Sequence, residues 1–385
     1  MENNGPNYLP SPQRCTGDAL IEMAQITKTF KNAAGEFTAL KGMTACFYPG
    51  EFVSVVGKSG SGKSTLVNMI TGIDHPTSGS VRVGDTYVHT LSESDMSVWR
   101  GANLGIVFQF FQLLPTLSLL ENVMLPMYLG GGFTPTQREG RALSLLKLVG
   151  LEGLENKLPA AVSGGQQQCA AIARALANDP PILIADEPTG NLDPRTAEDV
   201  FDLFAALIDQ GKTILMVTHD ISLAGRTTRT LLLSDGELIN PWVASALPDL
   251  GHSQMLWLTH HLEPRVIQPS AEVPVLDASG DWLILVTAGR LELSGHSGHP
   301  DAQARRRLGP GGFLSSLSLQ REGGGRSSLN LEADEPVELL VVEGPEFQRW
   351  LSQNPANRLA LDGAEWRPDQ AVLEAASHSS SGWNS

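Results

Sequence analysis

The sequence predicts an α/β domain with a mostly parallel sheet, followed by a small β-barrel or roll with flanking helices. Short apolar runs alternate with helical patterns in residues 1–240, an order that favours parallel strands covered by helices. After residue 251 the strand candidates are separated by glycine-rich turns, which is typical of small all-β domains. All eight lysines lie at or before Lys212, and this compositional break indicates two modules.

The elements of the first module are predicted from local pattern. Short, β-branched apolar runs are typical of buried strands, and apolar residues at helical spacing are typical of amphipathic helices. The predicted strands are 52–56, 182–185 and 213–217, and the predicted helices are 138–149 and 166–177. Residues 1–18, rich in Asn and Pro, are expected to form a flexible tail before a domain at 19–240.

The second module is expected at 252–375, after a linker at 241–251 that contains Pro and Gly. Its predicted elements are strands at 282–286, 290–294 and 336–342, glycine turns at 309–312 and 323–325, and a closing helix at 344–354. The Ser-rich residues 376–385 are expected to be a disordered tail.

Composition excludes several classes of protein. The 385 residues are 41% hydrophobic and 18% charged, which is globular, and a formal charge of −15 disfavours nucleic acid as a partner. No run of about 18 apolar residues is present, so we expect no membrane span, and residues 1–15 lack a secretory h-region. Cys15, Cys46 and Cys169 are too few for a disulfide scaffold and form no CxxC pair, so a reducing compartment is expected.

A glycine-rich motif follows the strand predicted at 52–56. Residues 57–64, Gly-Lys-Ser-Gly-Ser-Gly-Lys-Ser, fit G-x-x-x-x-G-K-[ST], the pattern of a phosphate-binding loop between a strand and a helix. Glycines let backbone amides close on phosphates, and the helix start adds a positive end. Lys63 is suited to the β- and γ-phosphates, and the Ser64 hydroxyl to Mg²⁺. The strand and helix context disfavours a glycine turn that arose by chance.

Two carboxylates end the strand predicted at 182–185. Asp186 is placed to hold the water shell of Mg²⁺, and Glu187 to polarise the water that attacks the γ-phosphate. Two acids at a strand end would ordinarily be solvated residues. A phosphate-binding loop in the same chain favours the catalytic interpretation.

Further motifs, in order along the chain, make residues 19–240 resemble the ABC-transporter ATPases. Val162-Ser163-Gly164-Gly165-Gln166 resembles the signature loop, and Ser163 lies 23 residues before Asp186, as is typical of the family. The other matching positions are Gln109 for the Q-loop, Gly190-Asn191-Leu192-Asp193 for the D-loop, His219 for the switch histidine and Phe30 for the aromatic that stacks on adenine.

The resemblance implies a P-loop fold with a helical subdomain, and Mg²⁺-ATP hydrolysis at two composite sites of a head-to-tail dimer. It assigns catalysis to Glu187, His219 and Gln109, and Mg²⁺ to Ser64, Gln109 and Asp186. The nucleotide contacts that it implies are Phe30, Gly57, Lys58, Ser59, Gly60, Ser61, Gly62, Lys63, Ser64, Thr65, Ser163, Gly164, Gly165, Gln166 and Asp193. Of these, Ser163 and Gly165 would act on the ATP of the other protomer.

Each of these positions also has an ordinary structural interpretation. Gln109 could be a structural amide and His219 a hydrogen-bonded loop residue, while Phe30 and its neighbour Phe37 could both belong to the core. Ser163 is expected to cap a helix, a role that is compatible with anion binding because a helix N-terminus presents free N–H groups.

The subfamily is indicated by residues 110–123 together with the Gln-rich signature, which resemble the class that serves lipoprotein release and macrolide export. That class drives extracytoplasmic domains by mechanotransmission. Two positions depart from the pattern, since Val162 replaces leucine and Cys169 replaces arginine. We expect the lost cation at Cys169 to weaken the electrostatics near the signature helix, which puts the turnover rate in doubt.

Residues 252–375 resemble a cyclic-nucleotide-binding domain, through residues 289–293, 308–319 and 326–328, with a leading helix at 255–262. Arg326 matches the arginine that binds the cyclic phosphate in that family. Ser315 and Ser316 stand where the family has glycine and the glutamate that binds ribose, so a charge-assisted bond is lost. We therefore expect a degenerate regulatory or interaction module, and no cyclic nucleotide as its ligand.

The leading functional hypothesis is the ATPase subunit of a membrane transport or mechanotransmission complex. It requires two separate integral-membrane permease subunits, docked near Gln109 and residues 110–127, and a location in the cytoplasm on the inner face of the cell membrane. The alternatives are a soluble, non-transport ABC ATPase and an ATPase gated by a cyclic nucleotide or another small ligand. The cofactors expected are ATP and Mg²⁺.

Overall fold

The computed structural model describes residues 15, 18–33, 35–190, 192–220, 225–269, 280–295, 306–317, 329–332 and 335–362. The chain divides into two compact units, Met1–Leu238 and Ile239–Ser385. The predicted tail at 376–385 and all of the predicted tail at 1–18 except Cys15 and Asp18 lie outside the described residues.

The first unit is built on a six-stranded sheet with the order β10-β9-β3-β8-β7-β6. Its strands are β3 (Phe52–Val56), β6 (Leu104–Val107), β7 (Ile182–Asp186), β8 (Thr213–Thr218), β9 (Arg229–Ser234) and β10 (Glu237–Leu238). All neighbours are parallel except β10, which runs antiparallel to β9. The three strands predicted from apolar runs are thereby confirmed as β3, β7 and β8. They form because β-branched side chains suit a sheet that is buried on both faces.

A second, antiparallel sheet with the order β2-β1-β4-β5 completes the strands of this unit. Its members are β1 (Ile21–Asn32), β2 (Gly35–Phe47), β4 (Ser78–Val83) and β5 (Thr86–Tyr87). Side chains of β1, β2 and β4 share one buried core with strand β3 and the helix that follows it, α1 (Lys63–Thr71). The glycine-rich loop therefore leaves the core sheet close to the antiparallel sheet.

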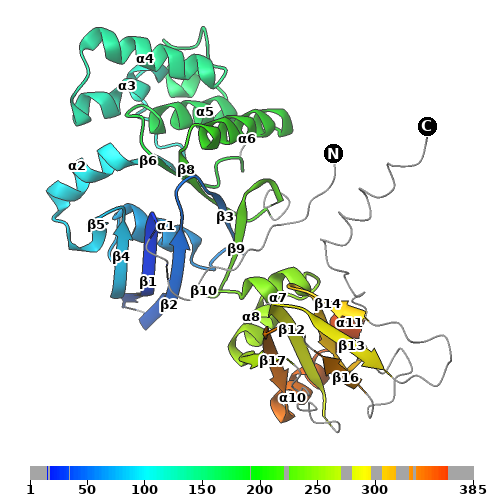
Figure 1. The fold of residues 1–385 in the computed structure, drawn as a ribbon. Helices are drawn as coiled ribbons and strands as arrows, with labels where there is room; N and C mark the ends of the chain where they lie inside the picture. Colours follow the sequence, from blue (N-terminus) through cyan, green and yellow to red (C-terminus); the bar gives the residue numbers. More distant parts are fainter. Residues whose placement is uncertain are drawn as a thin grey trace, which may run out of the picture. The chain divides into compact units, whose positions relative to one another are not determined.

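Helices cover the parallel sheet and extend beyond it as a helical layer (Figure 1). The helices are α1 (Lys63–Thr71), α2 (Glu93–Asn103), α3 (Leu119–Gly130), α4 (Pro135–Leu148), α5 (Gly164–Ala175) and α6 (Pro194–Asp209), with short 3₁₀ turns at Val88–Thr90 and Pro159–Ala161. Helices α3, α4 and α5 pack on one another and share a core with α6. The helices predicted at 138–149 and 166–177 are confirmed as α4 and α5.

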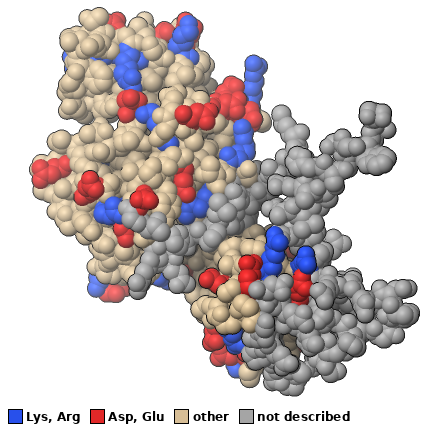
Figure 2. All heavy atoms as spheres, in the orientation of Figure 1, with Lys and Arg blue, Asp and Glu red and all other residues tan. Residues whose placement is uncertain are grey.

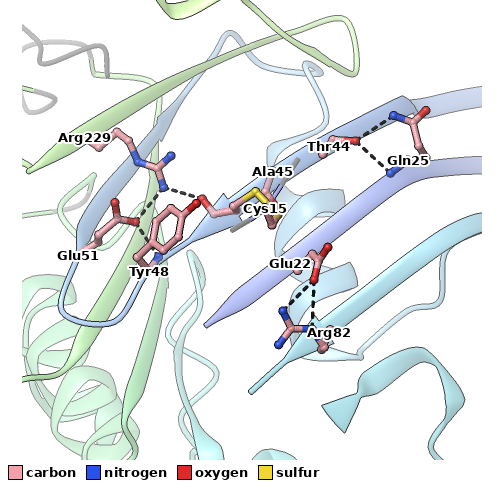
Figure 3. The surroundings of a disulfide bond; sticks show 10 residues. Cys15, Glu22, Gln25, Thr44, Ala45, Tyr48, Glu51, Arg82 and Arg229 are labelled. Atoms are coloured by element: carbon pink, nitrogen blue, oxygen red, sulfur yellow. Dashed lines mark hydrogen bonds and ion pairs between the residues drawn. A yellow bond between two sulfur atoms is a disulfide. The ribbon is translucent and has the colours of Figure 1, made fainter. Parts of the chain in front are cut away.

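A disulfide joins Cys15 to Cys46, 31 residues away, near the end of strand β2 (Figure 3). The cysteine count predicted a reducing compartment and no bridge, and a bridge is unusual for a cytosolic protein because disulfides persist mainly in oxidising surroundings. The pairing was hidden because β2 brings Cys46 to a segment distant in sequence. The backbone oxygen of Cys46 also accepts a 2.6 Å bond from buried Arg229, which pairs with Glu51 at 2.8 Å.

The second unit contains two antiparallel sheets among its described residues, with the orders β11-β17-β12-β15 and β14-β13-β16. The strands are β11 (Glu263–Ile267), β12 (Trp282–Ala288), β13 (Leu291–Gly295), β14 (Arg306–Leu308), β15 (Phe313–Ser315), β16 (Leu329–Glu332) and β17 (Val337–Glu343). The helices are α7 (Pro241–Ala246), α8 (His252–His261), α10 (Pro345–Gln353) and α11 (Pro355–Asp362). The strands predicted at 282–286, 290–294 and 336–342 and the two helices predicted at 255–262 and 344–354 are confirmed.

The prediction of a linker at 241–251 is wrong. Residues 241–246 form helix α7, and Val243, Ala244 and Leu247 are buried. Asn240 caps the helix through its side-chain oxygen, which accepts a 2.9 Å bond from the Trp242 amide. Pro and Asn suggested a flexible segment, but Pro at a first helical position preceded by an Asn cap is a helix start.

No helix in the described parts of the chain combines the length and the apolar character needed to cross a membrane. On the face shown in Figure 2, Lys and Arg side chains of the first unit are interspersed with Asp and Glu. A continuous basic surface of the kind that binds nucleic acid is therefore not formed on this face by the described residues.

Candidate nucleotide-binding site

The glycine-rich loop leaves β3 at Gly57 and enters helix α1 at Lys63. A Cβ on Gly57 would lie 2.3 Å from the Leu233 carbonyl oxygen, and one on Gly62 would lie 2.6 Å from the Ala39 oxygen. Gly62 also adopts φ 106°. Only glycine fits both positions, so the backbone can close here into the amide-lined turn that phosphate groups need.

Lys63 lies beneath this loop with its ammonium group turned onto main-chain oxygens. Its Nζ donates to the carbonyls of Gly57 at 2.7 Å and Lys58 at 3.1 Å. Burial lowers the pKa of this amine, while the negative charges of Glu187 and Asp186 act in the opposite direction. A phosphate at the loop would supply the anionic partner that a buried ammonium lacks.

Ser64 and Asp186 meet from α1 and the end of β7. The Ser64 hydroxyl donates to Asp186 Oδ2 at 3.0 Å. Burial raises the pKa of the Asp186 carboxyl and neighbouring Glu187 adds to the rise, whereas the Ser64 bond and Lys63 oppose it. A hydroxyl and a carboxylate held side by side are oxygen ligands of the type that Mg²⁺ takes, and a cation would stabilise the ionised carboxylate.

Glu187 is held by two other residues that the sequence motifs indicated. Its carboxylate accepts a bond from Gln109 Nε2 at 3.3 Å and lies 3.0 Å from His219 Nδ1. An ionised carboxylate can only accept, so the imidazole carries its proton on Nδ1 in this contact. Glu187 adopts φ 47°, while its amide donates to the Val217 oxygen at 2.8 Å. Left-handed backbone at a non-glycine residue is typical of functional sites.

One cleft of about 570 Å³ is lined by Lys63, Ser64, Gln109, Glu187 and His219, together with Phe30 and Phe37. The two phenylalanines pair across the β1–β2 hairpin and are 40% and 57% exposed, so neither is a core residue. Lys28 Nζ lies 5.0 Å from the Phe30 ring centroid. Phe37 therefore joins Phe30 at the rim of the cleft. The hairpin register that brings them together could not be read from single motifs.

The signature residues lie on a different surface of the same unit. Ser163 caps α5, because its hydroxyl accepts from the Gln166 amide at 3.2 Å while the Gln166 side chain accepts from the Ser163 amide at 3.0 Å. Ser163, Gly165 and Gln166 line a second cavity of about 570 Å³, with Cys169 and Asp193. One protomer thus does not bring the signature loop to its own glycine-rich loop.

Two residues near the signature helix have well-defined environments. Asp193 caps α6 by accepting from the amides of Arg195 and Thr196, both at 3.1 Å, and these bonds with the Thr196 hydroxyl lower its pKa. Burial, with the charges of Asp199 and Asp193, raises the pKa of the Cys169 thiol to about 11. Asn191 of the predicted D-loop lies outside the described residues.

In the second unit, the two serines singled out by sequence make internal contacts. Ser315 is buried, and its hydroxyl donates to the Leu361 carbonyl at 3.3 Å. The Ser316 hydroxyl donates to Asp281 at 3.2 Å and accepts from the Trp282 amide at 3.2 Å. Arg326 and the glycine turn at 323–325 lie outside the described residues. A ligand that used these hydroxyls would have to displace existing bonds.

Comparison with known proteins places the first unit among ATP-binding cassettes. The family model described as ABC transporter matches residues 40–190. An uncharacterised ABC transporter ATP-binding protein of Methanocaldococcus jannaschii is 44% identical over 223 residues, which span 57% of this chain and 95% of the relative. The lipoprotein-releasing system ATP-binding protein LolD of Idiomarina loihiensis is 41% identical over 57% of this chain and 97% of its own length.

Two further comparisons extend these findings. The macrolide export ATP-binding/permease protein MacB of Syntrophobacter fumaroxidans is 45% identical over 56% of this chain, which covers 31% of MacB. The dimeric structure of the cassette MJ0796 bound to ADP and Pi matches with a TM-score of 0.55 and 43% identity, over 57% of this chain and 96% of that one. The likeness therefore lies in both sequence and fold.

Proposed function

The chain belongs to the ABC transporter ATP-binding proteins, as an ATPase subunit of the LolD and MacB type, and we propose that it powers separate membrane subunits through two composite sites in a dimer. One observation carries the proposal. Ser64 and Glu187 line one cleft at the glycine-rich loop, where Ser64 also bonds Asp186, while the signature loop lies on another surface. Such a division leaves each site incomplete until a second protomer closes it.

In this proposal Lys63 and the amides of residues 57–65 bind the phosphates, and Phe30 or Phe37 stacks on the base. Glu187 accepts a proton from the attacking water, because its carboxylate is held at the cleft by Gln109 and His219. His219 is 62% exposed in its side chain, so it is free to contact the γ-phosphate when nucleotide enters.

Ser64, Asp186 and Gln109 would hold Mg²⁺. The fit rests on the Ser64–Asp186 contact and on the raised pKa of Asp186, which a cation would reverse. When bound, the ion would neutralise charge on the β- and γ-phosphates. The chain's own part is to orient the phosphates and to hold the accepting carboxylate of Glu187 in place.

The other protomer would complete each site with Ser163, Gly164, Gly165 and Gln166, whose capped helix start offers amide groups to the γ-phosphate. Asp193, at the start of α6 beside this surface, would lie near the dimer interface. The matched cassette of known structure is a dimer with bound ADP and Pi, which supports this arrangement.

We place the permease contact near Gln109. Phe110 is 76% exposed directly after it, and Leu114 is also exposed within the segment 110–127. Exposed apolar side chains beside a nucleotide-sensing residue fit a docking surface for a membrane partner. Two integral-membrane subunits are proposed, with this chain peripheral to them on the cytoplasmic face of the membrane. Detergent co-purification tests this, and the absence of any permease would favour a soluble ATPase.

The test of the ATPase assignment is Glu187→Gln in the full chain. The variant should bind Mg²⁺-ATP and dimerise, while steady-state hydrolysis falls by about 100-fold or more because the proton acceptor is gone. Size-exclusion chromatography with and without ATP, together with phosphate release, measures both properties. Hydrolysis at the wild-type rate would show that another group accepts the proton.

For the second unit we propose a regulatory or interaction role without a cyclic nucleotide. Ser315 and Ser316 are engaged by Leu361 and Asp281, which disfavours a ligand at that position. Calorimetric titration of the full chain with cyclic AMP and cyclic GMP, with ATP sites saturated by ADP, should detect no binding. Binding at micromolar concentration would instead favour an ATPase gated by a cyclic nucleotide.

A further inference from the structure

The segment between β6 and α3, residues 108–118, has no regular secondary structure, yet helical side chains hold its backbone. Asn122 of α3 is fully buried; its Oδ1 accepts from the Leu114 amide at 2.7 Å and its Nδ2 donates to the Leu117 oxygen at 3.0 Å. Arg174 of α5 holds the earlier part of the segment, at residues 111–112. The segment contains Gln109, the residue that contacts Glu187.

The Arg174 guanidinium binds two consecutive carbonyl oxygens as a fork. One terminal nitrogen donates to Gln112 O at 2.6 Å and the other to Phe111 O at 2.9 Å. Gln112 adopts φ 51°, which is an unfavourable backbone conformation for a residue with a side chain. The planar fork suits this paired geometry, and a single ammonium group does not reproduce it.

Arg174 is half-buried. No carboxylate among the described residues pairs with Arg174, and burial lowers the pKa of its guanidinium. The two carbonyl bonds therefore provide the main compensation for its charge. These two bonds therefore oppose the separation of α5 from residues 111–112.

The same helix presents the signature loop at its other end. Helix α5 begins at Gly164 behind the Ser163 cap, and a Cβ at Gly164 would lie 3.7 Å from Phe111 Cζ. The ring of Phe111 therefore lies beside the start of α5, and its carbonyl is held by Arg174 near the end of the same helix. The segment that contains Gln109 is thus tied to α5 at both ends of that helix.

We propose that Arg174 is a positioning residue that couples the Gln109 segment, beside one ATP, to the signature loop that serves the ATP of the partner protomer. The inference rests on the two-site function proposed above. Its role is geometric, because Arg174 lines neither cleft. Loss of the fork should impair closure and hydrolysis more than it impairs nucleotide binding by a single protomer.

The chain offers a matched control in Arg141 of α4. That side chain makes an equivalent fork just beyond the end of α5, from Nε to Ala177 O at 2.6 Å and from a terminal nitrogen to Leu176 O at 3.0 Å. It does not touch the Gln109 segment. Arg174→Gln and Arg141→Gln therefore each remove a guanidinium fork on two backbone carbonyls, and only the first cuts the proposed coupling. Arg141→Gln also loses an ion pair with Asp179 at 3.5 Å, so it is the more demanding control for stability.

The experiment measures three quantities in the full chain: ADP affinity, kcat and KM for Mg²⁺-ATP, and the ATP concentration for half-maximal dimer in the Glu187→Gln background. Arg174→Gln should leave ADP affinity within about twofold, lower kcat by about tenfold, and raise the dimer midpoint about fivefold. Arg141→Gln should keep kcat and the dimer midpoint within about twofold of wild type. Arg174→Lys, which keeps the charge without the fork, should have an intermediate kcat.

Equal kcat and dimer midpoints in Arg174→Gln and Arg141→Gln would overturn the inference, as would a wild-type kcat in Arg174→Lys. If Arg174→Gln folds poorly by circular dichroism, the lysine variant alone decides. The proposed function itself would be rejected by a different result, in which the wild-type chain does not hydrolyse ATP and the Glu187→Gln variant does not dimerise with ATP. The two failures are thus distinguishable.

Discussion

The carboxylate of Asp186 lies where the protein disfavours its charge. Burial is the largest influence on its pKa, and adjacent Glu187 adds repulsion that the Ser64 bond and Lys63 only partly offset. An acid whose pKa is raised in the folded state destabilises the fold when it is ionised. This loss of folding free energy is absent at pH values below the unfolded pKa of about 4, and it is complete at pH values above the folded pKa.

Asp186→Asn should therefore stabilise the nucleotide-free protein at pH 7, by about 1 kcal/mol, while it lowers hydrolysis by about 100-fold. The gain should shrink as the pH falls towards 4, where the wild-type carboxyl is protonated as well. Urea unfolding at the two pH values and phosphate release measure the two effects.

Asp179→Asn is the control with the opposite sign. The pKa of Asp179 is lowered, mainly by the Lys212 hydrogen bond, so its ionised form stabilises the fold. Its replacement should destabilise the protein at pH 7. If both asparagine variants lose stability at pH 7, the charge of Asp186 is better accommodated than its burial indicates.

Cysteine reactivity provides a second prediction about single residues. Cys15 and Cys46 are bonded, and the Cys169 thiol is 5% exposed with a pKa of about 11. About 0.1% of this thiol is ionised at pH 8, so it should react very slowly. Ellman's reagent should count no thiol in the native protein, one in denaturant and three after denaturation with reduction. Two rapidly reacting thiols in the native state would mean that the bridge is open.

Among the elements, the three helices of the helical layer begin alike. Each has a reciprocal capping box, in which a hydroxyl accepts from a backbone amide three residues later and a side chain bonds back. The pairs are Ser118 and Glu121 in α3, Thr134 and Gln137 in α4, and Ser163 and Gln166 in α5. The boxes are equivalent in structure, so a difference in function must come from where each helix start lies.

Ser163→Ala and Thr134→Ala should therefore have similar effects on stability and different effects on activity. Each removes one helix cap and should lower the free energy of unfolding by about 1 kcal/mol. Only Ser163→Ala should lower ATPase activity, by about tenfold, because only that helix start is proposed to face the partner's ATP. Thermal unfolding and steady-state kinetics at saturating ATP decide. Equal activity in both variants would argue against a role for Ser163 beyond capping.

The parallel strands and their motifs were predictable because both depend on local sequence. Runs of apolar residues predicted β3, β7 and β8. Parallel strands have their carboxyl ends at one edge of the sheet, and this brings Asp186 close to the loop that follows Val56. Contacts between distant segments were not predictable. The β1–β2 register that places Phe37 beside Phe30, and the Arg174 fork, depend on tertiary packing that no short motif records.

In the chain as a whole, the Cys15–Cys46 bridge is the covalent tie between the start of the chain and the antiparallel sheet (Figure 3). Cys46 pairs with Glu22 across the β1–β2 ladder, and its carbonyl is bound by Arg229 from β9 of the core sheet. The bridge thus closes a loop that contains β1 and most of β2. The bridge therefore lies beside the Arg229–Cys46 hydrogen bond, which joins the parallel sheet to the antiparallel sheet.

Reduction of this bridge should destabilise the first unit. Opening a loop with a sequence separation of 31 residues removes about 3 to 4 kcal/mol in the chain-entropy account, or about 10 °C in the midpoint of thermal unfolding for a unit of this size. Differential scanning fluorimetry of the full chain with and without a thiol reductant measures the shift. Cys15→Ser should unfold at the lower temperature under both conditions. Cys169→Ser, which leaves the bridge intact, should still respond to the reductant, and an unchanged midpoint after complete reduction would mean that the bridge adds no stability.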